Sequence, residues 1–329
     1  MKEERKMAVK YSPTDYLYLS ARLRAKEATL VGKEQLARYR AMHSAAEITA
    51  ALVAEGVFPA DTPREQALEA LLREGFATVR EAAPDPALFA FLQYPFDCHN
   101  LKTVLKCHYL ERAPERLLID AGSVPAEQIA KIPADVPAAL PAHLREGVER
   151  AREAYERTRD PREIDFVLDA ACFADMAQNA AALPAAARLV RARAEMTNLR
   201  TCRRLLSMQA GEPGEVMLSR AFLPGGVTDL ATLLAAYREG DSGFAALVAI
   251  SEFACVFESA DPAATDLAMD NAYLAVAKEQ ARVHYGAEIA FGYLLGVEYA
   301  VKNLRILLVA RETDEDDATL GGRLRENYV

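Results

Sequence analysis

The chain of 329 residues has no tryptophan, five cysteines and five histidines, and only 8% of its residues are aromatic. Five scattered cysteines, an odd number, do not suit a disulfide framework and are typical of free thiols in a reducing cytosol. Positive charge is also short: 39 Lys and Arg residues face 48 Asp and Glu residues, which gives a net charge of -9 and a pI of about 5.3. This balance argues against a nucleic-acid-binding protein, which needs a basic surface, and against direct docking on anionic lipid headgroups.

Long apolar runs are missing as well. The best candidates for a membrane span, 243–256 and 286–301, are interrupted by Glu252 and by Glu288 and Glu298, and neither reaches the roughly 18 apolar residues that a spanning helix needs. Residues 1–6 are charged and no apolar stretch follows them, so the sequence predicts no signal peptide. The alternation typical of β-strands is almost absent. The sequence therefore predicts an all-α, cytoplasmic protein.

One short helical pattern occurs three times. It consists of Asn, Leu and a basic residue, and its copies start 98 and 105 residues apart, at Asn100-Leu101-Lys102, Asn198-Leu199-Arg200 and Asn303-Leu304-Arg305. A second landmark precedes each copy: the segments starting at residues 34, 127 and 229 lie 66, 71 and 74 residues before the three asparagines. Two landmarks at nearly constant separation indicate a triplicated chain, which must be recognised before any site is interpreted.

The repeat predicts three units of several helices each, at residues 1–125 (with an extra N-terminal helix at 14–29), 126–226 and 227–329. Units of this size fit the usual size of a hydrophobic core. Segments 119–125 and 223–228 have the composition of turns in corresponding places. We expect Pro95 to interrupt a helical stretch at 87–111, and the glycines at 211 and 214 to end the helix at 185–209. Three further glycines, at 286, 292 and 296, mark either helix ends or close backbone packing within 273–311.

No motif for catalysis or metal binding is convincing. The best metal candidate combines 97–99 with Cys107 and His108, but Cys98 and Cys107 would face nearly opposite sides of a helix, about 13 Å apart along its axis. Gly32-Lys33 lacks the upstream glycine of a phosphate loop, and Glu34 stands where a magnesium-binding hydroxyl belongs. We therefore expect no active site, no metal and no cofactor, and interpret the cysteines as core residues.

A basic stripe is the remaining charged feature. Arg193, Arg200 and Arg204 lie within about 40° of one another on a helical wheel. On an acidic protein such a stripe can dock an acidic partner. The alternative interpretation is an ordinary solvated helix face.

The repeated pattern resembles the C-type central-stalk component of archaeal and bacterial V/A-type ATPases, whose counterpart in the eukaryotic vacuolar enzyme is the d-type component. The resemblance covers essentially the whole chain in order. It rests on the segments 15–24, 99–102, 164–169 with Phe173, 195–200, 267–273, 303–307 and 323–329. One departure is visible: an acidic residue stands three places before the first two asparagines, at Asp97 and Glu195, whereas Ala300 occupies that place in the third unit.

The resemblance implies a non-catalytic rotor subunit. Three related helical domains would surround a pseudo-threefold axis and form a funnel, which would sit on the membrane-embedded proteolipid ring and receive the foot of the central shaft. The protein would be peripheral on the cytoplasmic face of the membrane and couple ATP hydrolysis or synthesis to passage of protons or sodium ions. In this interpretation Leu101, Leu199 and Leu304 fill the three cores and the asparagines hydrogen-bond within or between helices.

Two alternatives stay open at this point. A helical-repeat scaffold for another protein would form an elongated solenoid with repeats of about 34–47 residues, which is shorter than the period found here. A helical enzyme would assemble a pocket of convergent titratable groups with perturbed pKa values.

Overall fold

A computed structural model describes residues 12–329, and within this range the chain forms helices and no strand. The charged segment 1–6 lies outside the described residues. The all-α prediction is confirmed. The helices before the first asparagine are η1 (Pro13–Tyr16), α1 (Leu17–Glu27), α2 (Lys33–Arg40), α3 (Ala45–Ala54), α4 (Arg64–Ala82) and η2 (Pro86–Leu92).

The remaining helices carry the three repeated patterns on α5, α9 and α14. In chain order they are α5 (Tyr94–Tyr109), η3 (Glu115–Leu117), α6 (Ala126–Ile129), α7 (Ala142–Thr158), α8 (Arg162–Ala180), α9 (Pro184–Ser207), α10 (Gly211–Ala221), α11 (Leu230–Arg238), α12 (Asp241–Ala249), η4 (Ala254–Phe257), α13 (Pro262–Gln280), α14 (Glu288–Glu312) and α15 (Asp317–Gly321). The second landmark falls at the start of α2, α6 and α11.

Local sequence signals explain where several helices begin. The side chains of Ser44, Asp229 and Asp261 cap α3, α11 and α13 by accepting backbone N–H groups of the first turn, which satisfies donors that have no partner inside the helix. Pro95 stands in the first turn of α5, where a missing N–H costs nothing. The helical stretch 87–111 is interrupted next to Pro95 as expected, at Gln93 between η2 and α5.

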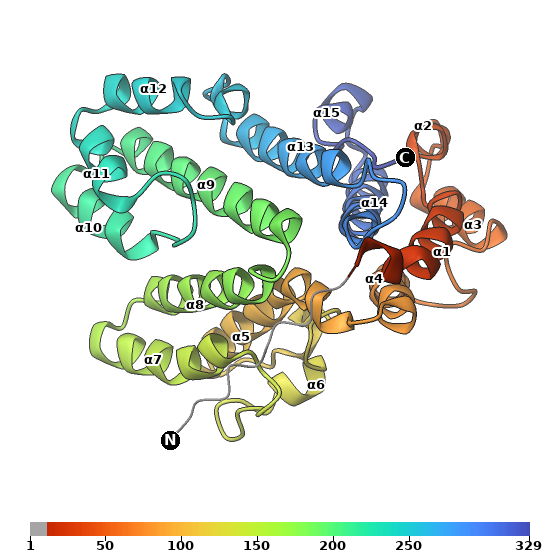
Figure 1. Ribbon diagram of the computed structural model, residues 1–329, viewed down its shortest axis with the longest axis horizontal. Coiled ribbons are helices and arrows are strands. Elements are labelled where there is room, and N and C mark those ends of the chain that lie inside the picture. Colours follow the sequence, from red (N-terminus) through yellow and green to blue (C-terminus); the bar gives the residue numbers. More distant parts are fainter. Residues whose placement is uncertain (1–11) are drawn as a thin grey trace.

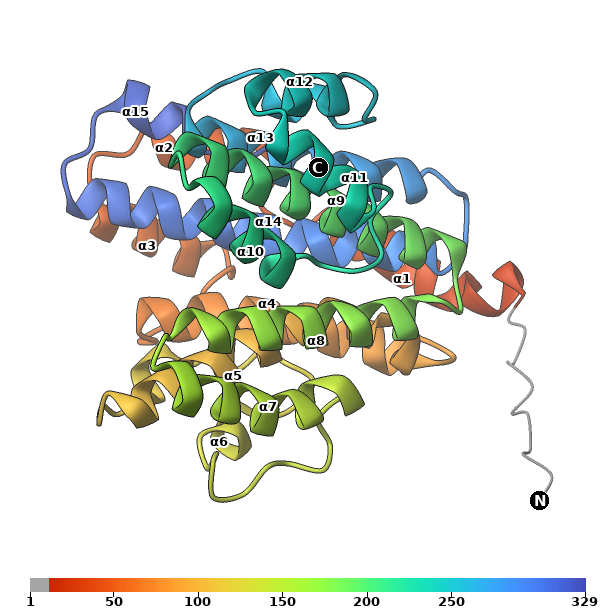
Figure 2. The ribbon, with the colours of Figure 1, turned by 90° about the vertical axis from the view of Figure 1, so that its left-hand side faces the viewer.

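Six long helices form a closed circuit of contacts. α5 packs on α8, α8 on α9, α9 on α13 and α13 on α14, and α14 then packs on α4. The circuit closes through η2, which contacts α4, α5 and α8. Figure 1 shows the result as three groups of helices: α5–α8, then α9–α12, then α1–α4 together with α14 and α15. In the view turned by 90°, the long helices α4, α8 and α14 lie roughly parallel to one another and extend across the molecule (Figure 2).

The two ends of the described chain meet in this arrangement. α14, near the C-terminal end, packs against α1, α2, α3 and α4. The helices of the predicted third unit thus share a core with those of the first, because α14 buries residues on all sides, among them Phe291, Leu295 and Leu307. The boundaries at residues 125 and 226, and a threefold relation between the units, stay predictions.

The glycines of the C-terminal part have different roles. The chain leaves its helical path at residues 281–287, where Gly286 has a φ of +151°. Gly292 and Gly296 lie inside α14, and a Cβ atom on either would come within 2.6–2.8 Å of Tyr328. These two glycines therefore mark close packing and let the Tyr328 ring lie on the backbone of α14. At 211 and 214, predicted to end α9, the glycines instead belong to the first turn of α10.

No helix among residues 12–329 is long and apolar enough to cross a membrane.

Candidate functional site

Each of the three repeated asparagines binds one loop residue through both its backbone groups. The Asn100 side chain donates to the carbonyl of Ile119 and accepts its N–H, both at 2.8 Å. Asn198 forms the same two hydrogen bonds with Leu223, at 2.8 and 2.9 Å. Asn303 forms them with Arg325, at 3.0 and 2.9 Å. The partners follow their asparagines by 19, 25 and 22 residues.

These amides are nearly solvent-free, since at most 1% of each asparagine is exposed. A buried amide needs hydrogen-bond partners, and so do the buried N–H and carbonyl of a loop residue. Here each asparagine side chain bonds both backbone groups of one loop residue, as a neighbouring strand would. We expected these amides to bond within or between helices, and this was wrong. Each asparagine instead bonds a residue outside the helices and thereby attaches that segment to its own helix. Leu101, Leu199 and Leu304, one residue later, are all 0% exposed.

A buried acid strengthens the first two of these attachments. Asp97 accepts the N–H groups of Ser123 and Val124 and the Ser123 hydroxyl, and Glu195 accepts those of Val227 and Thr228 and the Thr228 hydroxyl. Burial raises the pKa of Asp97 to about 6, although the hydroxyl and the two N–H groups of 123–124 act to lower it. The two segments predicted as turns are therefore the segments that the buried acids hold.

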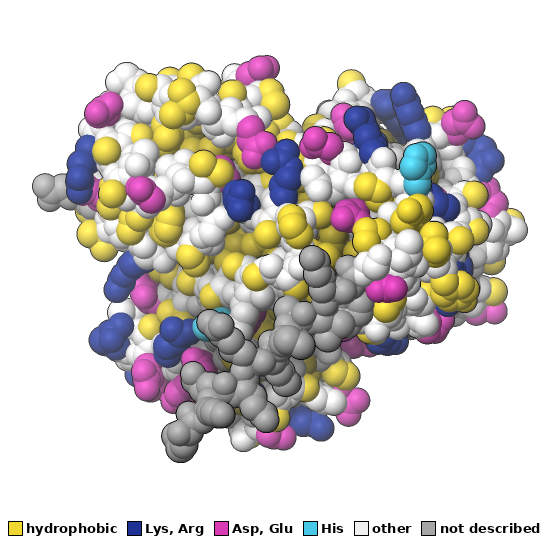
Figure 3. Space-filling model, viewed as in Figure 1, with side chains coloured by type: hydrophobic (Ala, Val, Ile, Leu, Met, Phe, Trp, Pro, Cys, Tyr) yellow, Lys and Arg dark blue, Asp and Glu magenta, His cyan; other side chains and the backbone are white. Residues whose placement is uncertain are grey.

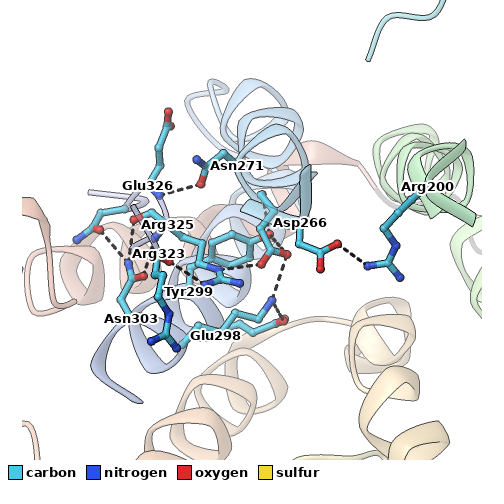
Figure 4. A network of polar contacts seen from close by, with 12 residues as sticks. Arg200, Asp266, Asn271, Glu298, Tyr299, Asn303, Arg323, Arg325 and Glu326 are labelled. Carbon is cyan, nitrogen blue, oxygen red and sulfur yellow. Dashed lines mark hydrogen bonds and ion pairs between the residues drawn. The ribbon is translucent and has the colours of Figure 1, made fainter. Parts of the chain in front are cut away.

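The third unit uses a different arrangement around the segment 323–329, which lies outside the helices. Its backbone is held by Asn303 at Arg325, by Asn271 at the N–H of Glu326 (2.9 Å), and by Lys278 at the carbonyl of Asn327 (2.5 Å). Figure 4 shows Asn303, Arg325, Glu326 and Asn271 in this network, with Tyr299 beside them.

The same segment also reaches the start of the chain. The Tyr328 hydroxyl donates to Glu27 of α1 at 2.8 Å, and the carbonyl of Val329 accepts the N–H of Lys33 at 3.2 Å. Segment 323–329 thus ties α13 and α14 to α1 and α2. The sequence contained one sign of this contact, the glycines at 292 and 296, for which close backbone packing was one of two interpretations. No pattern in the sequence showed that Tyr328 is the residue packed against them.

The basic residue of each pattern forms an ion pair with a different long helix. Lys102 on α5 pairs with Asp169 on α8 at 2.7 Å, and Arg200 on α9 pairs with Asp266 on α13 at 2.8 Å. Arg305 on α14 pairs with Glu65 on α4 at 3.0 Å. The pairs follow the circuit of helices, but most of these side chains are 37–50% exposed and the pairs are worth little as sources of stability.

The basic stripe is not uniformly exposed. Arg200 and Arg204 are exposed, whereas Arg193 is half-buried and its guanidinium carbon lies 5.5 Å from the centroid of the Tyr273 ring. All three arginines line one groove of about 610 Å³ between α5, α8, α9 and α10. Among the described side chains, which do not include that of Glu212, Arg204 forms no ion pair. The stripe's contact with a partner stays a prediction.

The groove also holds acidic groups, and the cations around it are mostly paired. Asp169 binds Lys102, and Asp165 binds Lys106 at 2.6 Å. Arg162, the first residue of α8, binds Asp160 at 2.6 Å. Figure 3 shows the same mixture on one face of the molecule, where basic and acidic side chains stand among hydrophobic ones and the surface is hollowed between helix groups.

The residues considered for a metal centre have other partners. Cys98 is buried and its Sγ lies 3.5 Å from the Leu168 carbonyl and 3.5 Å from Asp169, while His99 lies 3.1 Å from the carbonyl of Leu117. Cys107 is also buried. Among the described residues, no three His, Cys, Asp or Glu side chains are grouped so that they could hold a metal ion.

Comparison with known proteins agrees with the repeated pattern. No curated protein matches the chain. A sequence model of the family described as ATP synthase (C/AC39) subunit matches residues 19–320. The match spans nearly all of the described chain, including the three asparagines and the loop partners Ile119 and Leu223. The chain therefore belongs to the ATP synthase (C/AC39) subunit family.

Proposed function

We propose that this chain is the non-catalytic central-stalk component that couples the shaft of a V/A-type ATPase to its proteolipid ring, on the cytoplasmic face of the membrane. Membership of the C/AC39 family supports a place in the ATPase complex. The coupled ion is a proton or a sodium ion, carried by the ring and not by this chain.

The closed circuit of helix contacts is the observation that carries the proposal. A coupler has to transmit torque, and closely packed helices resist compression. α14 packs on α4, η2 closes the circuit between α4, α5 and α8, and the segment 323–329 also fastens α14 to α1 and α2. A body closed in this way shears less than an open row of helices, because a force on one group of helices is passed in both directions around the circuit.

The alternative of a helical-repeat scaffold fits the contacts less well. In a solenoid each repeat contacts only its neighbours in the chain, whereas here α14 packs against α1 to α4. The alternative of an enzyme asks for titratable groups that are free to react. In the groove beside α9, Lys102, Asp165 and Asp169 are paired with one another or with Lys106.

Binding and transport measurements test the proposal. We expect the purified full chain to bind both the isolated proteolipid ring and the isolated shaft subunits, and ATP-driven ion transport to be lost when the chain is omitted from the complex. Binding to neither, under conditions in which the complex is intact, would refute the coupling role and leave a helical protein with another partner.

A matched pair of variants tests whether closure matters for coupling. Gly296→Leu places a side chain where Tyr328 lies, whereas Gly322→Ala adds a methyl group with its nearest neighbour at an ordinary 3.5 Å. We expect the number of ions transported per ATP to fall in the first variant and to stay unchanged in the second. Equal coupling in both, with the first variant shown to be folded, would contradict the argument from closure.

A further inference from the structure

The half-buried Arg193 and the buried Tyr273 line a second recess, on the other flank of α9 from the groove described above. This recess has a volume of about 140 Å³ and lies between α9, α13 and α14. Arg193, Thr197 and Arg200 line both the recess and the groove. The inner part of the basic stripe therefore borders both hollows.

One buried polar group at this recess, the Tyr273 hydroxyl, lacks the partner that burial normally demands, and the half-buried Arg193 beside it has no ion-pair partner in the described chain. The Tyr273 hydroxyl is buried, with 5% of the residue exposed; burial raises its pKa and Arg193 acts to lower it, but no described side chain or backbone group lies within hydrogen-bond geometry of it. No carboxylate of the described chain lies within 4 Å of the Arg193 guanidinium, which rests against the Tyr273 ring. Buried polar groups are nearly always satisfied by protein, water or a ligand, so an acceptor is missing from this place.

The other charged groups around the recess are already neutralised. Asp270 lies 2.9 Å from Arg325 and 3.5 Å from Lys302, and Glu298 lies 3.1 Å from the same lysine. Burial would raise the pKa of Asp270, but Lys302 and Arg325 hold it below its usual value. Arg200 is paired with Asp266. Arg193 is thus the cation of the recess with no carboxylate of the described chain within ion-pair distance, and Asp270 and Glu298 act on its charge only from farther away. The cations that line the recess, Arg193, Arg200 and Lys302, outnumber its carboxylates, Asp270 and Glu298.

We propose that this recess binds one small inorganic oxyanion of the size and charge of phosphate, with Arg193 as the main ligand and the Tyr273 hydroxyl as a second donor. A guanidinium presents parallel N–H groups that match two oxygens of such an ion. The volume admits a few waters or one small ion, and excludes a nucleotide. The ion would join α9 to α13, which are neighbours in the circuit of helices. The inference concerns the isolated chain and does not depend on the coupling role.

Titration calorimetry of the full chain with inorganic phosphate, at constant ionic strength maintained with chloride, tests the proposal. We expect saturable binding of one ion, displaced by sulfate. Loss of a charge-assisted contact predicts that Arg193→Gln weakens binding about tenfold or more, and loss of a neutral one predicts a weakening of about two- to tenfold for Tyr273→Phe. Arg204→Gln, at the groove but not the recess, serves as the control and should bind like the unchanged chain.

Other outcomes would overturn it. Absence of saturable binding, or equal binding by Arg193→Gln and the unchanged chain, removes the site. Displacement of phosphate by ATP would show that the ion binds in the open groove instead. Arg193→Gln could disturb folding, so Tyr273→Phe is the second test. This variant removes one unpartnered oxygen and should leave the ligand-free chain at least as stable as before, so phosphate binding as tight as that of the unchanged chain would by itself contradict the proposal.

Discussion

Replacing Asn198 with leucine tests the account of the repeated asparagines most directly. Leucine has a similar branched shape but no polar atoms, so the substitution removes both hydrogen bonds to Leu223 while keeping most of the packing. The N–H and carbonyl of Leu223 are buried and would be left without partners. Each buried group left unsatisfied costs about 1–3 kcal/mol, so for the two groups we expect a loss of about 2–6 kcal/mol, a large share of the typical stability of a folded protein.

The three positions should differ in a defined order. Leu223 is buried, whereas Ile119 and Arg325 are half-buried and water can partly replace the lost bonds. We therefore expect the same substitution to cost most at Asn198 and less at Asn100 and Asn303. The free energy of unfolding in urea gives the magnitude, and amide hydrogen exchange at the three loop residues shows whether the attached segment has been released.

Asn271 provides the control. Its side chain accepts one N–H from Glu326, an exposed contact, and its replacement by leucine should cost about 1 kcal/mol or less. The reasoning fails if Asn198→Leu costs no more than Asn271→Leu, or if exchange at Leu223 is not accelerated.

Two further predictions concern Asp97 and Gly296. Burial raises the pKa of Asp97 to about 6, against the opposing hydrogen bonds from Ser123, so the folded state binds the proton of this carboxyl more tightly than the unfolded chain does. The free energy of unfolding, relative to that of Asp97→Asn, should therefore fall by up to about 3 kcal/mol as the pH rises from about 4 to 6. A difference between the two proteins that is independent of pH would contradict this. Gly296→Leu should destabilise the chain by about 1–3 kcal/mol, because the new side chain overpacks against Tyr328. It should also accelerate amide hydrogen exchange along 323–329. Gly322→Ala should have neither effect in the same urea unfolding and hydrogen-exchange measurements.

Part of the candidate site was predictable because it is encoded in local patterns. The copies of Asn-Leu-basic, the turns at 119–125 and 223–228 and the absence of β alternation were all visible along the chain. Other features were not. The loop partner of each asparagine lies 19–25 residues away, and no periodicity links the two positions. Pro95 gave an ambiguous signal, since proline both ends helices and begins them.

What the sequence by itself determined is the all-α class, the threefold recurrence of one helical pattern and the family to which it points. Composition and periodicity are properties of neighbouring residues, and they are sufficient for these conclusions. Only the tertiary structure decided that α14 packs against α1 to α4, that Tyr328 rests on Gly292 and Gly296, and that Arg193 turns from the stripe toward Tyr273. These contacts join residues far apart in the chain, and burial and hydrogen-bond satisfaction select them only when the helices come together.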